Sequence, residues 1–264
     1  MRKTALMAAL GASALCIALA QSSAQPIIGL ITKTDSNPFF VKMKEGAEAE
    51  AKKLGAKLLS GADKTDGGVL IGKYAKAAMG GKKAVIAAMD YNPGQPVGIL
   101  RHNGFLAGFG MKGITAKTPN QVDTGIVCSQ NSFGDQAKGQ TAMENCLQKN
   151  PNINMVYTIN EPAAAGAYQA LKAAGKEKGV IIVSVDGGCE GIRNVQKGVI
   201  TATSQQYPLK MAAMGVAAGV EYAKSGKKVS GYTDTGVTLI AKRAYAGVAS
   251  QNAAFGLANC WGTK

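Results

Sequence analysis

The sequence predicts an α/β fold built around a parallel sheet. Short apolar runs that resemble strands alternate with longer segments that resemble helices, which is typical of βαβ units. The strand runs are almost continuously apolar, and this favours a sheet that is covered by helices on both faces. Four of these runs end in a small cluster of polar residues, a placement that bears on function.

The expected elements follow one another along nearly the whole chain. Apolar runs predict strands at residues 27–32, 56–59, 84–89, 124–128, 155–158, 180–185, 200–204 and 237–240. The longer segments between them predict helices at residues 39–54, 69–79, 97–109, 135–148, 162–174, 190–196 and 209–224. The strand at 124–128 has the weakest pattern and the helix at 135–148 a strong one. No long linker, low-complexity tract or short-period repeat interrupts the series.

The polar clusters at the strand ends point to one binding crevice. They contain Asn37, Asn160, Asp186 and Gln206, and open α/β sheets bind ligands beyond the carboxyl ends of their strands. Planar amides and carboxylates can each bond two neighbouring hydroxyls, so this set suits a neutral, hydroxyl-rich small molecule.

Each cluster also has a purely structural interpretation. Asn37 before Pro38, and Asn160 before the next helix, are both suitable helix N-caps, and Asp186 begins an Asp-Gly-Gly sequence that fits a plain turn. The fourfold repetition of the same placement favours the binding interpretation.

Two aromatic residues and one arginine are further candidates for this crevice. Phe39 and Phe40 start a helix directly after the first strand's loop, where one is expected in the core and the other against the C–H face of a sugar ring. Arg101 lies on a helix and is either a solvated charge or a fixed fork of hydrogen-bond donors.

The first 24 residues are predicted to be a secretory signal peptide. Arg2 and Lys3 form a positive start, residues 4–20 are uncharged and mostly apolar, and Ser22-Ser23-Ala24 is a small-residue cleavage site. The apolar run is shorter than the ~20 residues that a membrane span needs, which disfavours a permanent anchor. We therefore expect an exported mature chain.

The charge balance is basic. The full chain has 30 basic and 16 acidic residues, and without Arg2 and Lys3 its net charge is +12. Because most lysines are expected at helix ends and turns, where cations complement the helix dipole, we expect a soluble surface and no nucleic-acid partner. An acidic partner surface or an anionic envelope is the alternative.

Four cysteines remain after the signal peptide, and an exported protein with an even number is expected to form disulfides. Cys128, Cys146, Cys189 and Cys260 allow three pairings. No CxxC motif is present and the single His102 is far from all four in sequence, so no metal site is expected.

Signals for an enzyme are few. The sequence lacks a GxSxG elbow and a GxxxxGK[ST] loop, and the glycines of residues 104–110 follow no strand. A glycosidase would need two facing carboxylates, and beyond Asp186 the crevice offers only Asp35 or Glu161. We therefore expect a binding protein without a cofactor.

Specific stretches resemble a known family. Residues 27–46, IIGLITKTDSNPFFVKMKEG, resemble the opening of periplasmic sugar-binding proteins of the ribose-binding type, in particular the fructose/ribose branch that serves ABC importers. Further matches in order are RHNGF at Arg101, GDQAKGQTAMEN at Gly134, YTINEPAAAGAYQALKAAGK at Tyr157, VSVDGG at Val183, ATSQQYPLKMAAMG after Thr201, and AFGLANCWG at the end. The resemblance covers nearly the whole mature chain.

The resemblance implies a two-lobed periplasmic-binding-protein type I fold, with three crossing strands and a hinge that closes the lobes on a sugar. The sugar-binding set that it implies is Asn37, Phe39, Phe40, Arg101, Asn160, Asp186 and Gln206, with Gln206 at a hinge crossing.

The family often has an aromatic residue where this chain has Gly134, and Phe133 lies one residue earlier. Cys189 and Cys260 match cysteines of the fructose/ribose branch, which implies that they are bridged. Cys128 and Cys146 would then be the remaining pair.

One departure from the family affects the first lobe. The chain continues from residue 68 directly into VLIGKYAKAAM, which resembles the first helix of the second lobe. Two strand–helix units, about 60 residues, are therefore expected to be missing, together with an acidic cluster that binds sugar. The expected division is a shortened first lobe of residues 25–68 and 207–235, and a second lobe of residues 69–206 and 236–264.

The resulting prediction is a monomeric periplasmic protein that captures a ribose- or fructose-like monosaccharide for a membrane ABC permease. Its sugar binding is expected to be impaired by the missing segment. The alternative is a sugar sensor that presents its closed form to a membrane chemoreceptor or kinase. A lactose-repressor-like effector domain shares the fold, but the signal peptide and the lack of a helix-turn-helix before Ile27 argue against it.

Overall fold

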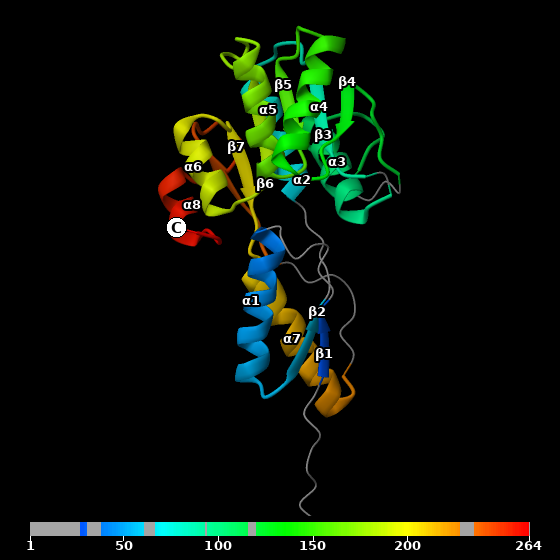
Figure 1. The fold of residues 1–264 in the computed structure, drawn as a ribbon, viewed down its shortest axis with the longest axis vertical. Helices are drawn as coiled ribbons and strands as arrows, with labels where there is room; N and C mark the ends of the chain where they lie inside the picture. Colours follow the sequence, from blue (N-terminus) through cyan, green and yellow to red (C-terminus); the bar gives the residue numbers. More distant parts are fainter. Residues whose placement is uncertain are drawn as a thin grey trace, which may run out of the picture.

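The computed structural model describes residues 27–30, 38–60, 67–92, 94–115, 120–227 and 235–263. The expected signal peptide and Asn37 lie outside these residues. Two sheets organise this part of the chain, a two-stranded sheet and a six-stranded sheet, and Figure 1 shows them at opposite ends of an elongated molecule.

The smaller unit contains few elements. β1 (Ile27–Leu30) pairs in parallel with β2 (Lys57–Ser60), and α1 (Pro38–Lys53) packs against α7 (Pro208–Ser225). Its core is formed by small and medium apolar side chains of α1 and α7, including Met43, Ala47 and Val216, with Trp261 added from the end of the chain.

The larger unit carries the remaining elements. In chain order they are α2 (Gly67–Met79), β3 (Ile86–Asp90), α3 (Pro96–Phe109), β4 (Ile126–Asn131), α4 (Gln136–Lys149), β5 (Met155–Thr158), α5 (Glu161–Ala173), β6 (Ile181–Asp186), α6 (Cys189–Lys197), β7 (Ala202–Gln205), β8 (Thr238–Ala241) and α8 (Ala253–Asn259).

The six-stranded sheet has the strand order β4-β3-β5-β6-β7-β8. All neighbours are parallel except β7 and β8, which are antiparallel. From β3 the chain crosses to β4 at one edge of the sheet, and from β4 it crosses back over β3 to β5. Because crossovers between parallel strands are right-handed, α3 covers one face of the sheet, and α4 and α5 cover the other. The direction in which strands are added therefore changes between the neighbouring strands β3 and β5, which is where such sheets bind ligands.

The register brings polar residues to one edge of this sheet. Asp186 at the end of β6 pairs with Gln205 at the end of β7. β7 leads directly into α7, so the carboxyl ends of the parallel strands face the smaller unit (Figure 1). The sheet therefore presents its ligand-binding edge to the junction between the two units.

Most expected elements agree with the observed ones to within two residues. β4 ends at Asn131, three residues beyond the expected end, and α8 was not expected at all. α8 has only seven residues and one buried position, Gly256, so it carries no apolar periodicity that a sequence pattern could reveal. Its start is stabilised by the side chain of Asn252, which accepts a hydrogen bond from the Phe255 N–H at 3.0 Å.

Both cysteine pairs are bridged. Cys189 bonds to Cys260, as the family resemblance implied, and links the start of α6 to the end of the chain. Cys128 bonds to Cys146 and links β4 to α4. No helix in the described ranges is long and apolar enough to cross a bilayer.

The hydroxyl of Tyr157 has no hydrogen-bond partner within the described structure, although the residue is fully buried against Phe105. A buried polar group without a partner costs about 1–3 kcal/mol. We expect Tyr157→Phe to leave the unfolding temperature unchanged or to raise it, as measured by circular dichroism.

A matched control is Tyr74→Phe, because the Tyr74 hydroxyl donates to the Arg243 carbonyl at 3.0 Å. The free energy of unfolding of this variant should be about 1 kcal/mol lower than that of the wild type. Equal destabilisation by the two variants would mean that Tyr157 has a partner after all, such as a bound water.

Candidate functional site

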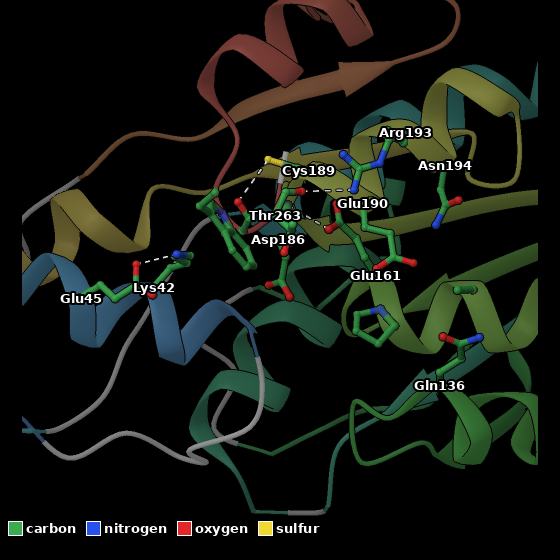
Figure 2. A pocket seen from close by; sticks show the side chains of 16 residues that line it. Lys42, Glu45, Gln136, Glu161, Asp186, Cys189, Glu190, Arg193, Asn194 and Thr263 are labelled. Atoms are coloured by element: carbon green, nitrogen blue, oxygen red, sulfur yellow. Dashed lines mark hydrogen bonds and ion pairs between the residues drawn. The ribbon is translucent and has the colours of Figure 1, made fainter.

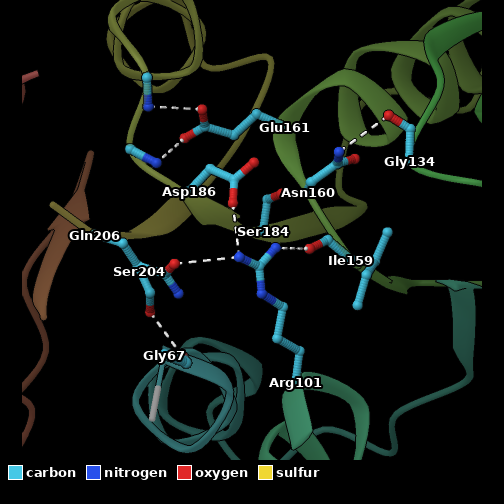
Figure 3. Close-up of polar contacts among 12 residues, drawn as sticks. Gly67, Arg101, Gly134, Ile159, Asn160, Glu161, Ser184, Asp186, Ser204 and Gln206 are labelled. Carbon is cyan, nitrogen blue, oxygen red and sulfur yellow. Dashed lines mark hydrogen bonds and ion pairs between the residues drawn. The ribbon is translucent and has the colours of Figure 1, made fainter. Parts of the chain in front are cut away.

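Three side chains from separate elements meet at the carboxyl edge of the large sheet. Arg101 of α3 forms an ion pair with Asp186, with 2.9 Å between Nη2 and Oδ1, and donates from the same nitrogen to Gln206 Oε1 at 3.1 Å. Its Nη1 donates to the Ile159 carbonyl at 2.8 Å. Figure 3 shows the guanidinium group between these acceptors. The sequence predicted all three side chains for one crevice.

This cluster is buried. Arg101 is 3% exposed, Asp186 4% and Gln206 0%. Charged hydrogen bonds are strongest in such surroundings, and removal of one partner leaves an uncompensated charge. The three groups are therefore held in fixed positions, and they bond one another in this structure.

Asp186 has an unusual backbone conformation, with φ at 138°, and the following Gly187 has φ at 79°. Left-handed and related conformations cost about 1–3 kcal/mol for residues other than glycine, and they concentrate at binding sites. The Asp186 carbonyl accepts a hydrogen bond from the Gln206 N–H at 2.9 Å, which ties the two backbone segments together.

The position of Arg101 depends on a close contact between α2 and α3. A Cβ on Gly68 would lie 2.4 Å from the Arg101 carbonyl oxygen, and one on Gly72 would lie 2.1 Å from that of Phe105. On the facing helix, Gly104 and Gly108 make equivalent close approaches to residues 68 and 69. Gly104 and Gly108 thus serve helix packing, whereas Gly110 ends α3 in a left-handed conformation.

Phe39 contributes to the junction between the units. Its ring packs edge-on against Trp261, with 5.2 Å between ring centroids, and its centroid is 6.0 Å from the Arg101 guanidinium carbon. Trp261 in turn donates from Nε1 to the Gln206 carbonyl at 3.1 Å. Phe40 belongs to α1, but its side chain, like Asn37, lies outside the described residues.

Asn160 has the structural role that the sequence left open. Its side chain caps α5 by accepting from the Ala163 N–H at 3.2 Å, and it donates to the Gly134 carbonyl at 3.0 Å.

Gly134 stands where the family often has an aromatic residue. A Cβ on Gly134 would come within 2.7 Å of the Tyr91 ring, so Tyr91 occupies the space beside it. Phe133 is 48% exposed and lies under the Lys138 ammonium group.

Glu161 has a buried carboxyl group, which the sequence analysis named only as a second carboxylate for a glycosidase and did not include in the sugar-binding set. It accepts hydrogen bonds from the backbone N–H groups of Gly187 and Gly188, at 2.8 and 2.9 Å, and from the Thr203 hydroxyl at 2.7 Å. It therefore fixes the loop that follows Asp186. The sequence signal was its place in the Asn-Glu pair after a strand, opposite an Asp-Gly-Gly turn.

A cavity of about 410 Å³ opens beside this cluster, between α1 and the first turns of α5 and α6 (Figure 2). Small-molecule sites commonly have volumes of ~300–1,000 Å³. Among the predicted binding residues whose side chains the structure describes, the cavity wall includes only Asp186. The wall also contains Lys42, Glu45, Gln136, Glu161, Pro162, Ala165, Gly188, Cys189, Glu190, Gly191, Arg193, Asn194, Trp261, Gly262 and Thr263.

One trio of metal-type ligands exists in the described ranges, formed by Asp90, His102 and Asp123. The two ring nitrogens of His102 are both within hydrogen-bond distance of acceptors, at 3.0 Å from Asp90 Oδ1 and 2.9 Å from the Val122 carbonyl. Burial lowers the pKa of His102, but Asp90, the Val122 carbonyl and Asp123 together raise it above its usual value. Both ring nitrogens therefore face protein acceptors in this structure.

Comparison with known proteins identifies the family. The periplasmic binding protein domain matches residues 59–228. The chain belongs to this family. Its members are binding proteins, which agrees with the expectation that the chain is not an enzyme, and they are periplasmic proteins.

Two characterised relatives of this periplasmic binding protein show the extent of the match. It is 29% identical to the ribose import binding protein of Salmonella typhimurium over 278 residues, which covers 85% of this chain and 93% of the relative. It is 33% identical to the D-allose-binding periplasmic protein of Escherichia coli over 151 residues, or 57% of this chain and 46% of that protein, which is less than half the relative's length.

Solved structures support the same fold. A periplasmic solute-binding protein of Actinobacillus succinogenes with bound D-allose superimposes with a TM-score of 0.66 and 22% identity, covering 83% of this chain and 98% of that one. A galactofuranose-binding protein gives a TM-score of 0.65 at 20% identity, over 81% of this chain and 94% of that one. The predicted α/β architecture of parallel strands flanked by helices is therefore confirmed.

Glu161 makes stability depend on pH. Burial and then repulsion by Asp186 raise the pKa of Glu161 from 4.5 to about 8, although its hydrogen bonds from Thr203, Gly187 and Gly188 act in the opposite direction. The folded protein thus keeps a proton that the unfolded chain releases above pH 4.5. The stability from this group is full below about pH 4.5 and is lost as the pH rises to about 8.

We expect urea unfolding of the wild type to show this loss between pH 5 and pH 8. Glu161→Gln carries no titrating group at this position, so the difference in unfolding free energy between variant and wild type should change with pH over that interval. Parallel pH profiles for the two proteins would contradict the assignment.

Proposed function

We propose that the protein captures a neutral monosaccharide, of the ribose, fructose or allose kind, and delivers it to a membrane ABC permease. The observation that carries this proposal is the buried cluster of Arg101, Asp186 and Gln206 at the strand ends that face the smaller unit. The relatives named for ribose and D-allose support the substrate class.

The chemistry of the cluster suits vicinal hydroxyls. A guanidinium group only donates hydrogen bonds, a carboxylate only accepts them, and an amide does both, so together they match the mixed donor and acceptor character of a sugar. The side chains bond one another here, and sugar hydroxyls would replace part of these contacts. The centroid of the Phe39 ring lies 6.0 Å from the guanidinium carbon. In this proposal the apolar face of the ring would cover the sugar as the units rearrange.

Asn37, Phe40 and Asn160 belong to the same proposal by resemblance. Asn160 already uses its amide to cap α5 and to hold the Gly134 carbonyl, so its contribution to the sugar comes from the position it gives to the neighbouring loops. The cavity beside Asp186 is the route by which a sugar reaches the cluster.

We further propose that the smaller unit has lost a segment of the ancestral first lobe. In the alignment with the Salmonella protein, 85% of this chain is about 224 residues, which leaves about 54 of the 278 aligned positions without a counterpart in it. Two strands form a marginal sheet, and three or more are needed for independent stability. The proposed lobes are residues 25–68 with 207–235, and residues 69–206 with 236–264.

Asp186→Asn tests the site because it removes the charge and keeps the shape of the side chain. Charged hydrogen bonds contribute about 1.5–3 kcal/mol, so sugar affinity should fall roughly tenfold or more. The measurement is a thermal-shift panel of pentoses and hexoses, followed by calorimetry with the sugar that stabilises the wild type.

The control is Asp135→Asn. Asp135 is exposed and caps α4 through the Lys138 N–H at 2.9 Å, and asparagine caps equally well. The control should bind like the wild type. Equal sugar affinity for the Asp186 variant and the wild type would remove Asp186 from the site, and absence of stabilisation by any sugar would contradict the proposed function.

The missing segment should lower both local stability and affinity. Hydrogen exchange is expected to show residues 38–60 and 208–225 opening before residues 86–205, because the smaller core buries little apolar area. Insertion of the two absent strand–helix units from a full-length relative should strengthen sugar binding by orders of magnitude. Uniform protection together with micromolar sugar affinity in the present chain would show that the smaller unit is sufficient.

A further inference from the structure

Basic residues gather at the end of the large unit that is remote from the sugar cluster. The segments involved are the last turns of α2, α4, α5 and α6, the loops that follow them, and the two residues after β8. Their ten cationic side chains are accompanied by one carboxylate, that of Glu177. The ten are Lys76, Lys82, Lys83, Lys149, Lys172, Lys176, Lys178, Lys197, Lys242 and Arg243, here called the basic pole.

The topology explains why residues so far apart in sequence share one end. The helices run against the parallel strands, so their C-termini and the loops before β3, β5, β6 and β7 all lie at the amino edge of the sheet. β8 is antiparallel to β7, and its end returns to the same edge beside Thr201, which accepts from the Lys242 N–H. The carboxyl edge faces the smaller unit, at the opposite end (Figure 1).

Helix dipoles account for only part of the basic pole. A cation in the last turn stabilises a helix C-terminus, and this explains Lys76, Lys149, Lys172 and Lys197. The other six lie beyond the helices. All ten are exposed except the partly buried Lys176, and none has an ion-pair partner in the part of the chain that the structure describes.

We propose that the basic pole binds the anionic phospholipid surface of a membrane. With nine net positive charges it holds most of the net charge of +12 that the chain carries without Arg2 and Lys3. Each lysine near an anionic lipid surface contributes about 1 kcal/mol, and flexible lysines from several loops suit a diffuse layer of headgroup phosphates. Tyr245 follows the last of its segments, but its ring lies under the Arg243 guanidinium and packs edge-on against Tyr74, so it is not an open platform for the base stacking typical of single-stranded nucleic acids.

This orientation leaves the sugar cluster and the cavity on the side away from the lipid. Membrane binding is therefore independent of sugar, reversible and sensitive to salt, because no apolar side chain of the basic pole inserts between the lipids. It keeps the protein close to a membrane protein that receives its ligand, without blocking the site.

The test is co-sedimentation of the mature protein with vesicles of phosphatidylcholine that contain phosphatidylglycerol. The wild type should co-sediment with these vesicles at low salt and dissociate from them at about 0.3 M NaCl. It should not co-sediment with vesicles of phosphatidylcholine alone. A variant with Lys82→Gln, Lys83→Gln, Lys176→Gln and Lys178→Gln should bind more than tenfold more weakly.

The matched control removes the same charge from the other end of the molecule, with Lys52→Gln, Lys53→Gln, Lys224→Gln and Lys227→Gln, all exposed. It should bind like the wild type. Equal loss in both variants would mean that net charge alone matters, and retention by a soluble polyanion such as heparin without vesicle binding would assign the basic pole to another partner. Either result overturns the proposal without affecting sugar binding.

Discussion

The junction between the two units depends on the buried ion pair between Arg101 and Asp186. The arginine comes from a helix on one face of the large sheet, the aspartate from the end of a central strand, and the shared partner Gln206 from the segment that leads into the smaller unit. A guanidinium group has several donors in a rigid plane, so it can hold three acceptors from different segments at once. The loss of any one acceptor would leave a charge in a nearly dry environment.

Two neighbouring features hold the Arg101–Asp186 pair in position: the close contact between α2 and α3, and the hydrogen bonds of Glu161. The glycine contacts between α2 and α3 set the depth of the helix that carries Arg101, and side chains larger than hydrogen at Gly68 or Gly72 would push the helices apart. Glu161 holds the two backbone N–H groups that follow Asp186, which stabilises its positive φ. Positioning of the cluster thus results from backbone contacts that resist movement, as preorganised binding requires.

The elements and the cluster could be predicted because their signals are local. Runs of β-branched residues, helix caps and polar strand ends are visible within a few residues, and the crevice rule then places Asp186 and Gln206 together. Arg101 lies on a helix, so the residues alone left its role open and the family resemblance added it to the set. The roles of Glu161 and Trp261 depend on contacts with residues 26 to 55 positions away in the chain, which no local pattern encodes. Asn160 shows a different limit of sequence analysis. Its local pattern is visible, but asparagine suits both a helix N-cap and a sugar-binding side chain, so the pattern alone does not decide between the two roles.

The bridge between Cys189 and Cys260 has a consequence for how the protein matures. It joins residues 71 positions apart, and Trp261, next to the second cysteine, holds the Gln206 carbonyl while its own carbonyl accepts from the Cys189 N–H. A segment 71 positions downstream therefore locks the loop beside Asp186. The covalent part of this lock forms only in an oxidising compartment, so a copy retained in a reducing cytosol lacks the link that fixes the loop after Asp186.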